Sequence, residues 1–472
     1  MELPSILILL LQLLLTTHIA KAELTINLND GDSFKKAAST AAYDMVSYYN
    51  GNQSGQIPGK LEGTWWEGGA MFMTLIQYWH WTGDDSYNDI TNQGMLWQAG
   101  ENYDYMPKNW SIYLGNDDQM FWGLAAMTAA ELNYPDVDGK PSWLSLAQAV
   151  FNTQVPRWDN ATCNGGLRWQ IFPSEPGYTM KNAISNGGIF QLAARLARYT
   201  NNQTYANWAN TIWDWSATTP LLNTATWDIA DSTSVESQCK DHDDDQWTYN
   251  YGTYLMGAAY MYNMTNADPK WKSAIDGLLG TIWRNFFPQQ YGGNVMVEPC
   301  EVPKNCNRNE ICFKGFLSSW LAFTSLLAPY TAGQIIPKLQ QSALAAAKQC
   351  SGGSDGDHCG IAWCDPTWDG TQGLEQQMST LSLFANNLVA FQSQGGGADG
   401  GADKNPAPVT STTGGNSTSD PNAGTGSSSL ADATGSILRP ISTADRAGAG
   451  VLTVVFAMGW IGMVMWMIKD QW

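Results

Sequence analysis

The sequence predicts an all-α fold, an (α/α)6 toroid over residues 23–393 with a disordered stalk after it. Three observations predict this. Apolar residues in 23–393 recur with the helical period of about 3.6 rather than the strand period of two. Two kinds of helical segment alternate in a weak internal repeat of roughly 50–65 residues, which is the length of a helix hairpin. After residue 393, Gly, Ser, Thr and Pro replace the large apolar residues.

One kind of segment opens with small or polar residues and then runs apolar at helical spacing. Its dense Gly, Ala and Ser content would let a helix pack closely on both faces, as an inner ring requires. Six segments have this character: 64–81, 117–132, 186–200, 249–265, 314–328 and 372–388. The other kind is amphipathic, as an outer helix should be. Six segments are of this type: 33–49, 87–99, 142–154, 205–215, 270–285 and 334–349. Long loops at 155–180, 218–244 and 286–313 are expected to form the rim of a substrate cleft.

The two ends of the chain predict export and attachment to a membrane. Residues 1–22 read as a signal peptide, because a short apolar run precedes Ala20-Lys21-Ala22, although Glu2 is acidic where a base is usual. Residues 394–437 have the composition of a flexible linker. Residues 438–472 contain an apolar run after small residues, the pattern of a glycosylphosphatidylinositol (GPI) anchor signal. A transmembrane helix is the alternative. The four residues left after Ile468 favour the lipid anchor.

The composition points to an extracellular protein with an uncharged partner. The net charge of −19 argues against nucleic acid, which is bound by Lys and Arg. Only 14% of residues are charged, whereas the chain has 23 Trp and 19 Tyr, which could stack on neutral sugars. Eight cysteines predict up to four disulfides, of open connectivity, and no C-x2-C spacing suggests zinc. N-glycosylation sequons also fit the secretory pathway; they lie at Asn52, Asn109, Asn160, Asn202, Asn263 and Asn416.

Other kinds of catalytic machinery have little support in the sequence. The mature chain has three histidines and no H-E-x-x-H motif, so we expect neither a metal site nor a histidine-based triad. A G-x-S-x-G match at 352–356 lies in a Cys-rich loop after a helix, not at a strand-to-helix turn, and is interpreted as chance. No phosphate-binding or dinucleotide fingerprint is present, and no cofactor is expected.

The remaining candidates are carboxylates, above all Asp117 and Asp118 at the start of a predicted inner helix. Taken alone, this pair is most simply a helix cap, with Asn116 as the capping residue and acids that offset the helix dipole. As a functional pair, one carboxylate would be ionised as a nucleophile while its neighbour's charge keeps the other protonated as a general acid. Retaining glycosidases place two carboxyl groups about 5–5.5 Å apart, which adjacent residues can reach.

A second acidic and aromatic stretch, residues 241–250, precedes another predicted inner helix. Asp244 or Asp245 could cap that helix, but three adjacent acids are more than capping needs. The alternative is sugar binding, in which carboxylates accept bonds from hydroxyl groups and aromatic rings stack on the sugar. The candidate sugar-binding residues are Asp244, Asp245, Trp247, Tyr249, Asn250 and, from another inner helix, Trp66. The segments 65–67 and 163–169 are further rim candidates, although packing is the more common role for such residues.

Several motifs in order resemble the fungal mannan endo-1,6-α-mannosidases of glycoside hydrolase family 76. They are NDDQMFWGLAAMTAAE, CNGGLRWQ, NAISNGGIFQLAARLARYT and QWTYNYGTYLMGAA, and the likeness covers 23–393. The resemblance implies an (α/α)6 barrel that acts on α-1,6-linked mannose with retention, with Asp117 as nucleophile and Asp118 as general acid/base. It also implies a GPI-anchored cell-wall role on mannan or on the mannose core of GPI anchors, with wall β-glucan as a possible acceptor.

The sequence therefore predicts a monomeric retaining endo-α-1,6-mannosidase or transglycosylase outside the plasma membrane. The first alternative is a non-catalytic glycan-binding cell-wall protein that uses the same aromatic cleft. A lyase acting on acidic polysaccharides would need a basic cleft, which an acidic chain with no Arg/Lys cluster near these motifs does not suggest. The choice between hydrolysis and transfer, the natural donor and acceptor, and the anchor attachment residue stay open.

Overall fold

The computed structural model describes residues 24–108, 114–392 and 415–425, with helical residues 453, 456–460 and 463 near the C-terminus. The predicted signal peptide and most of the predicted anchor lie outside the described residues. Residues 1–424 form one compact unit and 425–472 a second. In the described part, no single helix is long and apolar enough to cross a membrane. Two consecutive helices, bent by 118° at the break between them, meet that test together.

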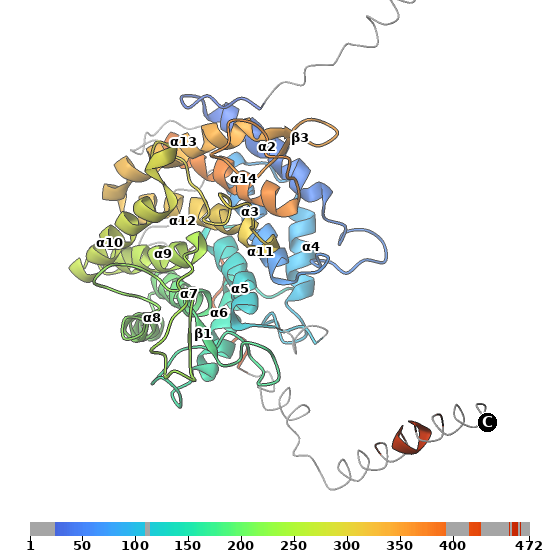
Figure 1. Ribbon diagram of the computed structural model, residues 1–472, viewed down its shortest axis with the longest axis vertical. Coiled ribbons are helices and arrows are strands. Elements are labelled where there is room, and N and C mark those ends of the chain that lie inside the picture. Colours follow the sequence, from blue (N-terminus) through green and yellow to red (C-terminus); the bar gives the residue numbers. More distant parts are fainter. Residues whose placement is uncertain are drawn as a thin grey trace, which may run out of the picture. The chain divides into compact units, whose positions relative to one another are not determined.

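Six inner helices form a closed ring in the first unit, and six outer helices surround it (Figure 1). The inner helices are α3 (Trp66–Thr82), α5 (Asn116–Glu131), α7 (Ala183–Thr200), α9 (Thr248–Met264), α12 (Phe313–Leu327) and α14 (Leu374–Asn386). Each packs on the next, and α14 returns to α3. The outer helices are α2 (Gly31–Ser47), α4 (Asn88–Gln98), α6 (Trp143–Gln154), α8 (Gln203–Ser216), α10 (Pro269–Phe286) and α13 (Ala332–Lys348). The (α/α)6 prediction, with its inner and outer assignments, is confirmed.

Short elements complete the unit. Strand β1 (Met180–Asn182) pairs antiparallel with β2 (Ser232–Ser234), and β3 (Cys350–Gly352) with β4 (His358–Cys359). A one-turn helix, α11 (Arg308–Ile311), precedes α12, and 3-10 turns lie at Val155–Arg157, Gln289–Tyr291, Pro329–Thr331 and Asn387–Phe391.

Small residues allow the inner helices to approach closely. A Cβ on Gly315 of α12 would lie 2.7 Å from the Cα of Ser379 on α14, closer than real Cβ contacts. Nearly every residue of α3, α5 and α7 is buried, whereas α2, α8 and α10 bury one face. The all-round apolar pattern of the inner segments is thus explained by contact on both sides.

Three disulfides join Cys163 to Cys239, Cys300 to Cys306 and Cys350 to Cys359. Cys312 and Cys364 are free thiols. The last two bridges close short loops of 6 and 9 residues, whereas the first joins positions 76 residues apart. Only this bridge therefore ties together two of the three long loops.

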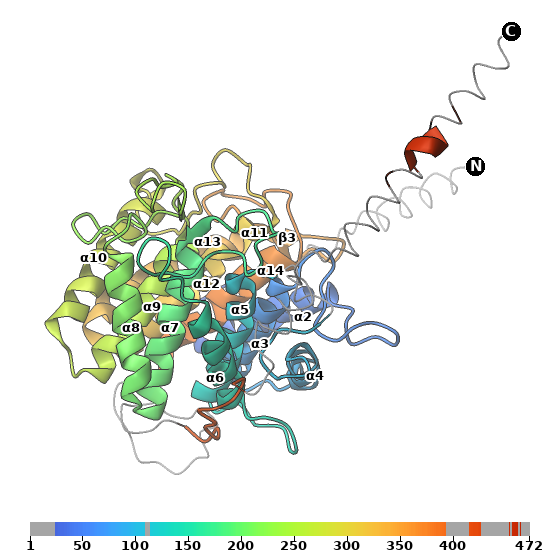
Figure 2. The same cartoon turned by 90° about the horizontal axis from the view of Figure 1, so that it is seen from below.

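The barrel has a distinct front and back. The inner helices run in one direction, so their N-terminal ends share one face, which we call the front. The outer helices begin at the opposite face, the back (Figure 2). Four outer helices, α2, α6, α8 and α10, have side-chain N-caps. Of the inner helices, α7 is capped by the Asn182 side chain, and the first N–H of α9, that of Thr248, donates to Glu298 Oε1 at 2.9 Å. The positive dipole ends of the inner helices are therefore directed to one face.

Candidate active site

A cavity of about 540 Å³ lies where these N-termini converge. Its lining comes from the starts of α3, α5, α7, α9 and α12 and from the three long loops predicted to form the rim. Aromatic rings make up much of the wall, and the charged residues are Asp117, Asp118 and Asp231. Lys and Arg are absent from this lining as far as the chain is described. The cavity therefore suits a neutral ligand with many hydroxyl groups rather than an anion.

The start of α5 is held in place by a neighbouring loop and an outer helix. The backbone N–H of Asn116 donates to the Trp169 carbonyl at 2.8 Å, and its side-chain amide donates to the Arg168 carbonyl at 2.9 Å. From α6, the Gln154 amide donates to the Asn116 carbonyl at 2.7 Å. Asp117 and Asp118 are therefore attached to a fixed backbone, as a catalytic pair requires.

Both aspartate side chains fold back over the helix start. Asp118 Oδ2 accepts the Gly115 N–H at 2.6 Å, and Asp117 Oδ1 accepts the Asp118 N–H at 2.9 Å. Asn182, the N-cap of α7, donates to Asp117 Oδ2 at 3.3 Å. A Cβ built on Gly115 would lie 2.3 Å from Asp117 Oδ1 and 3.2 Å from Asp118 Oδ2, so these oxygens are at most 5.5 Å apart. That limit fits the separation in retaining glycosidases, about 5–5.5 Å, and is shorter than in inverting ones.

Burial raises the pKa of both carboxyl groups. The pKa of Asp118 rises to about 6, opposed by its hydrogen bond from Gly115. The pKa of Asp117 rises well above its ordinary value, first through burial and then through the charge of Asp118. Both shifts favour the neutral form, so the pair holds a proton more readily than two free carboxyl groups would. The Gly115 N–H stabilises negative charge on Asp118, and the division of roles, with Asp117 as nucleophile and Asp118 as general acid, stays a prediction.

Gly115 provides a direct test of how closely the pair must be placed. We expect Gly115→Ala to displace the Asp117 carboxylate, because the new Cβ would lie 2.3 Å from Asp117 Oδ1. The backbone at Gly115 has φ −80°, which alanine adopts without strain, so the fold should persist. A displacement of about 1 Å can lower a rate by about 10²-fold. Steady-state kinetics and circular dichroism would check this, and unchanged kcat would contradict it.

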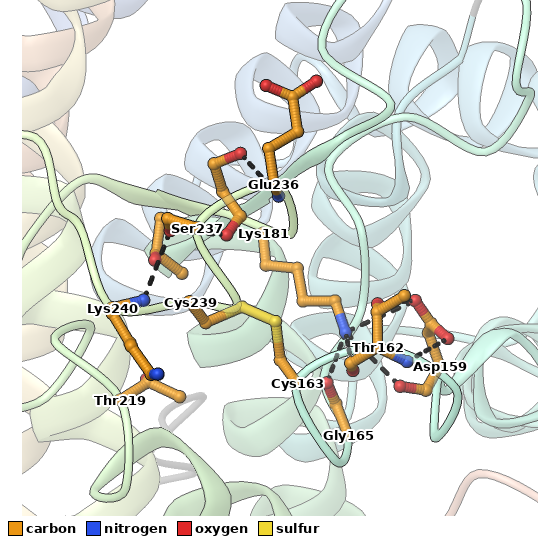
Figure 3. Close-up of a disulfide and its surroundings, with 12 residues drawn as sticks. Asp159, Thr162, Cys163, Gly165, Lys181, Thr219, Glu236, Ser237, Cys239 and Lys240 are labelled. Atoms are coloured by element: carbon orange, nitrogen blue, oxygen red, sulfur yellow. Dashed lines mark hydrogen bonds and ion pairs between the residues drawn. A yellow bond between two sulfur atoms is a disulfide. The ribbon is translucent and has the colours of Figure 1, made fainter.

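A disulfide and a buried lysine hold the loop that supports α5 in place. The disulfide Cys163–Cys239 joins it to the loop after β2, and the Lys181 ammonium lies beside the bridge (Figure 3). The Lys181 Nζ donates to the carbonyls of Thr162 at 2.7 Å and Gly165 at 2.5 Å, and forms an ion pair with Asp159 at 3.4 Å. Burial lowers the pKa of Lys181 to about 8. Lys181 precedes Asn182, so the same strand holds this loop and contacts Asp117.

Two of the predicted sugar-binding residues line the cavity. Trp66 packs on Phe121 with ring centroids 4.6 Å apart and donates through Nε1 to Asn309 Oδ1 at 3.2 Å. Tyr249 stacks on Phe313, with centroids 3.7 Å and planes 6° apart. These contacts hold each ring in a defined orientation, as stacking on a sugar requires.

The other four predicted binding residues do not line the cavity. Asp244 is an exposed side chain that pairs with His242 at 3.2 Å, and Asp245 is also exposed. Trp247 packs edge-on against Phe313. Asn250 is fully buried and donates to Asp231 Oδ1 at 2.7 Å. The acidic stretch lies in an irregular loop before α9, and only its last turn into the helix reaches the cavity, which explains why Tyr249 alone lines it.

Asp231 was missed by the sequence analysis. It lies directly before β2, lines the cavity with the aspartate pair, and accepts the Ala183 N–H with its backbone carbonyl at 2.8 Å. Burial raises the pKa of Asp231 to about 6, opposed by the bond from Asn250 and reinforced by Asp243, Asp245 and Glu310. The one local feature that could have indicated a site residue here is an acid that directly follows the apolar pair Ile229-Ala230 in a predicted rim loop.

An (α/α)6 barrel with a carboxylate pair at the bottom of an aromatic cavity defines a class of carbohydrate-cleaving enzymes. Comparison with known families agrees. The profile of Glycosyl hydrolase family 76 matches residues 33–396. The chain belongs to this family, and it is a glycoside hydrolase.

The relatives come from fungi. Mannan endo-1,6-alpha-mannosidase DCW1 of Saccharomyces cerevisiae is 40% identical over 463 residues, covering 97% of this chain and 98% of the relative. Mannan endo-1,6-alpha-mannosidase DFG5 of the same yeast is 39% identical and covers 90% of each chain. The crystal structure of Dfg5 from Chaetomium thermophilum in complex with glucosamine superposes with a TM-score of 0.78 at 43% identity, covering 86% of this chain and 99% of that one.

A more distant structure shares the fold. It is an inactive variant of the α-1,6-mannanase GH76A of Salegentibacter, with two adjacent aspartates replaced by asparagine, in complex with α-1,6-mannotriose. Its TM-score is 0.60 at 19% identity, covering 75% of this chain and 99% of that chain.

Proposed function

We propose that the protein is a retaining, endo-acting glycosidase or transglycosylase on α-1,6-mannosidic linkages, working in fungal cell-wall biogenesis. The observation that carries this proposal is the placement of Asp117 and Asp118. One oxygen of each lies near Gly115, within 5.5 Å of the other, and both residues line a cavity with aromatic walls and no basic lining residue among those described.

The reaction needs the two carboxyl groups in different protonation states. Asp117, as carboxylate, attacks C1 of a mannose, while Asp118 donates its proton to the leaving glycosidic oxygen. A mannosyl ester on Asp117 results. Asp118 then takes a proton from water or from an acceptor hydroxyl, which attacks C1 and releases Asp117. The proton of the pair must lie on Asp118 before the attack, and the short separation of the two carboxyl groups permits its transfer between them.

The names of the relatives support the linkage and the setting. Two yeast relatives are mannan endo-1,6-alpha-mannosidases, and the bacterial α-1,6-mannanase is inactive when an adjacent aspartate pair becomes asparagine. By extension, the donor here is mannan or the mannose core of a GPI anchor, and wall β-glucan is a candidate acceptor. A monomer held by a GPI anchor at the outer face of the plasma membrane, or in the wall, completes the proposal.

Hydrolysis of α-1,6-mannotetraose by the purified mature chain tests the activity and its stereochemistry. We expect proton NMR at early times to show the α-anomer at the new reducing end, because two displacements at C1 retain configuration. A β-anomer would overturn the retaining mechanism. Binding of the tetrasaccharide without cleavage, and without transfer to a glucan oligosaccharide, would favour the glycan-binding alternative.

A 2-fluoromannosyl fluoride should label Asp117, and a label on Asp118 would reverse the two roles.

Asp231 is proposed to bind sugar hydroxyl groups in the same cavity. One of its oxygens is held by Asn250 at 2.7 Å, which orients the carboxylate, and the residue lines the cavity. We expect Asp231→Asn to lower kcat/KM by about 10–100-fold, since a hydrogen bond to a charged group contributes about 1.5–3 kcal/mol. Asp245→Asn is the matched control, an exposed acid of the adjacent loop, and should have no effect. If Asp245→Asn is the more damaging, the assignment of Asp231 is wrong.

A further inference from the structure

Part of the predicted linker packs against the barrel. Residues 415–424 lie along the outer helix α6 (Figure 2), and we call this segment the strap. The strap begins beside the α5–α6 turn, where the Asn416 N–H donates to Asn133 Oδ1 at 3.0 Å and the Ser417 N–H donates to the Tyr199 hydroxyl at 3.1 Å. Ser417 Oγ also donates to Asp136 Oδ1 at 3.1 Å.

The strap continues along α6 in the direction of that helix. At the helix start, Ser142 Oγ donates to the Thr418 carbonyl and the Leu144 N–H donates to Ser417 Oγ at 3.0 Å. One turn later, the Asp420 N–H donates to Gln148 Oε1 at 2.7 Å. Asn152 then donates to the carbonyls of Pro421 at 2.9 Å and Ala423 at 2.8 Å. From residue 142 to residue 152, a helix rises about 15 Å.

This course changes the face at which the chain leaves the barrel. The barrel's last turn, Asn387–Phe391, follows the C-terminal end of α14 and packs through Phe391 on Phe34 at the start of α2, so it lies at the back. The strap carries the chain from the back, at Asn133, to the last turn of α6. Two residues beyond Asn152, Gln154 donates to the carbonyl of Asn116, next to the aspartate pair.

We propose that α6 is a docking surface for the strap, and that docking makes the anchored chain leave the barrel on the active-site side. The tether to the anchor then starts on the same side of the barrel as the open cavity. This inference rests on the proposed function and on the predicted anchor. The surface is polar, with Ser142, Gln148 and Asn152 bonded to the strap's backbone and small hydroxyl groups, so it fits this Ser- and Thr-rich segment.

Docking also shortens the tether. If the anchor is attached among the small residues Ala433 to Ser436, residues 425–433 separate it from the docked strap, whereas residues 393–433 separate it from the barrel once the strap is released. Effective concentration falls roughly as the −3/2 power of tether length, so release should lower encounters with a glycan on the same membrane by about tenfold.

The test uses the mature chain with its own anchor, reconstituted into lipid vesicles. Two donors are compared: free α-1,6-mannotriose, and the same trisaccharide joined to a phospholipid in those vesicles. One variant, Gln148→Ala/Asn152→Ala, removes the two α6 side chains that bond the strap along its length, and a second, Asn152→Ala, removes two strap bonds. Gln203→Ala, an exposed amide on the outer helix α8, is the control.

In the parent chain, we expect the backbone N–H groups of Asn416, Ser417 and Asp420 to be protected from hydrogen exchange. The double variant should keep its activity on the free donor and lose about tenfold on the lipid-held donor, with a smaller loss for Asn152→Ala. Unprotected amides in the parent, or equal turnover of the lipid-held donor by the double variant, would overturn the proposal. A parent that cleaves neither donor refutes the proposed function, while the exchange data still decide whether the strap docks.

Discussion

Asp117→Asn is expected to lower kcat by about 10⁴-fold or more, an effect of the size seen when a nucleophile is removed from other hydrolases. The amide keeps the shape of the carboxylate and can still accept the N–H of Asp118 through its oxygen. It cannot form the mannosyl ester. Asp118→Asn should cost about 10²–10⁴-fold, the contribution of general acid–base catalysis.

The same variant should not destabilise the fold. Burial and the charge of Asp118 raise the pKa of Asp117, so the folded state binds a proton that the unfolded state releases at neutral pH. Stability therefore falls as the pH rises from the unfolded pKa of Asp117 toward its raised folded pKa. A neutral asparagine removes this loss, so the melting temperature at pH 7 should rise or stay constant. Functional sites commonly sacrifice stability in this way.

The measurements are steady-state turnover of α-1,6-mannotetraose, its binding by calorimetry, and thermal melting at pH 5 and pH 7. Asp138→Asn, an exposed acid in the α5–α6 turn, is the matched control and should resemble the parent in all three. Turnover within tenfold of the parent would exclude Asp117 as nucleophile. Lost turnover with retained binding would separate catalysis from glycan recognition.

Arg195→Met is expected to destabilise the barrel by about 3–5 kcal/mol, because it leaves an unpaired charge in the interior. The Arg195 Nε donates to Glu131 at 3.1 Å, and its Nη2 forms an ion pair with the same carboxylate at 2.6 Å. Tyr260 donates to that carboxylate at 2.8 Å. All three side chains are buried near the back of the ring, so the ion pair joins α5 to α7 and the Tyr260 hydrogen bond adds α9.

Denaturant unfolding followed by Trp fluorescence measures this effect. The double variant Arg195→Met/Glu131→Gln should recover much of the loss, because replacing both partners removes the unpaired charge. Lys272→Met is the control. It breaks an exposed pair, Lys272–Asp276 at 2.6 Å, and should change stability by less than about 1 kcal/mol. If Arg195→Met is no more damaging than this control, the buried pair does not stabilise the barrel.

Much of the fold could be predicted from the sequence because helix periodicity is local. Segments such as 117–132, apolar and rich in Gly and Ala, are buried on two sides, whereas the outer segments are amphipathic, and this difference separated inner from outer helices along the whole barrel. The aspartate pair was found for a related reason: both acids lie in one helical turn, and the motifs around them resemble a known family.

The sugar-binding residues depended on contacts that no local pattern records. Asp244 and Asp245 stand in the most acidic stretch of the chain, yet they point to solvent, whereas the less conspicuous Asp231 lines the cavity. Loops are placed by distant partners, here by Asn250 on α9, the Ala183 N–H of α7 and the Cys163–Cys239 bridge. The composition of 394–437 predicted a linker but could not show that the strap finds hydrogen-bond partners on α6.

The sequence by itself determined the class of fold, the order of its helices and the identity of the aspartate pair, because each of these depends on residues that are close together in the chain. The tertiary structure alone decided how the chemistry is distributed within the site. Burial raises the pKa of both aspartates, and the Gly115 N–H stabilises negative charge on Asp118. Burial and the approach of distant loops are properties of the closed ring, and they arise only when the six hairpins meet.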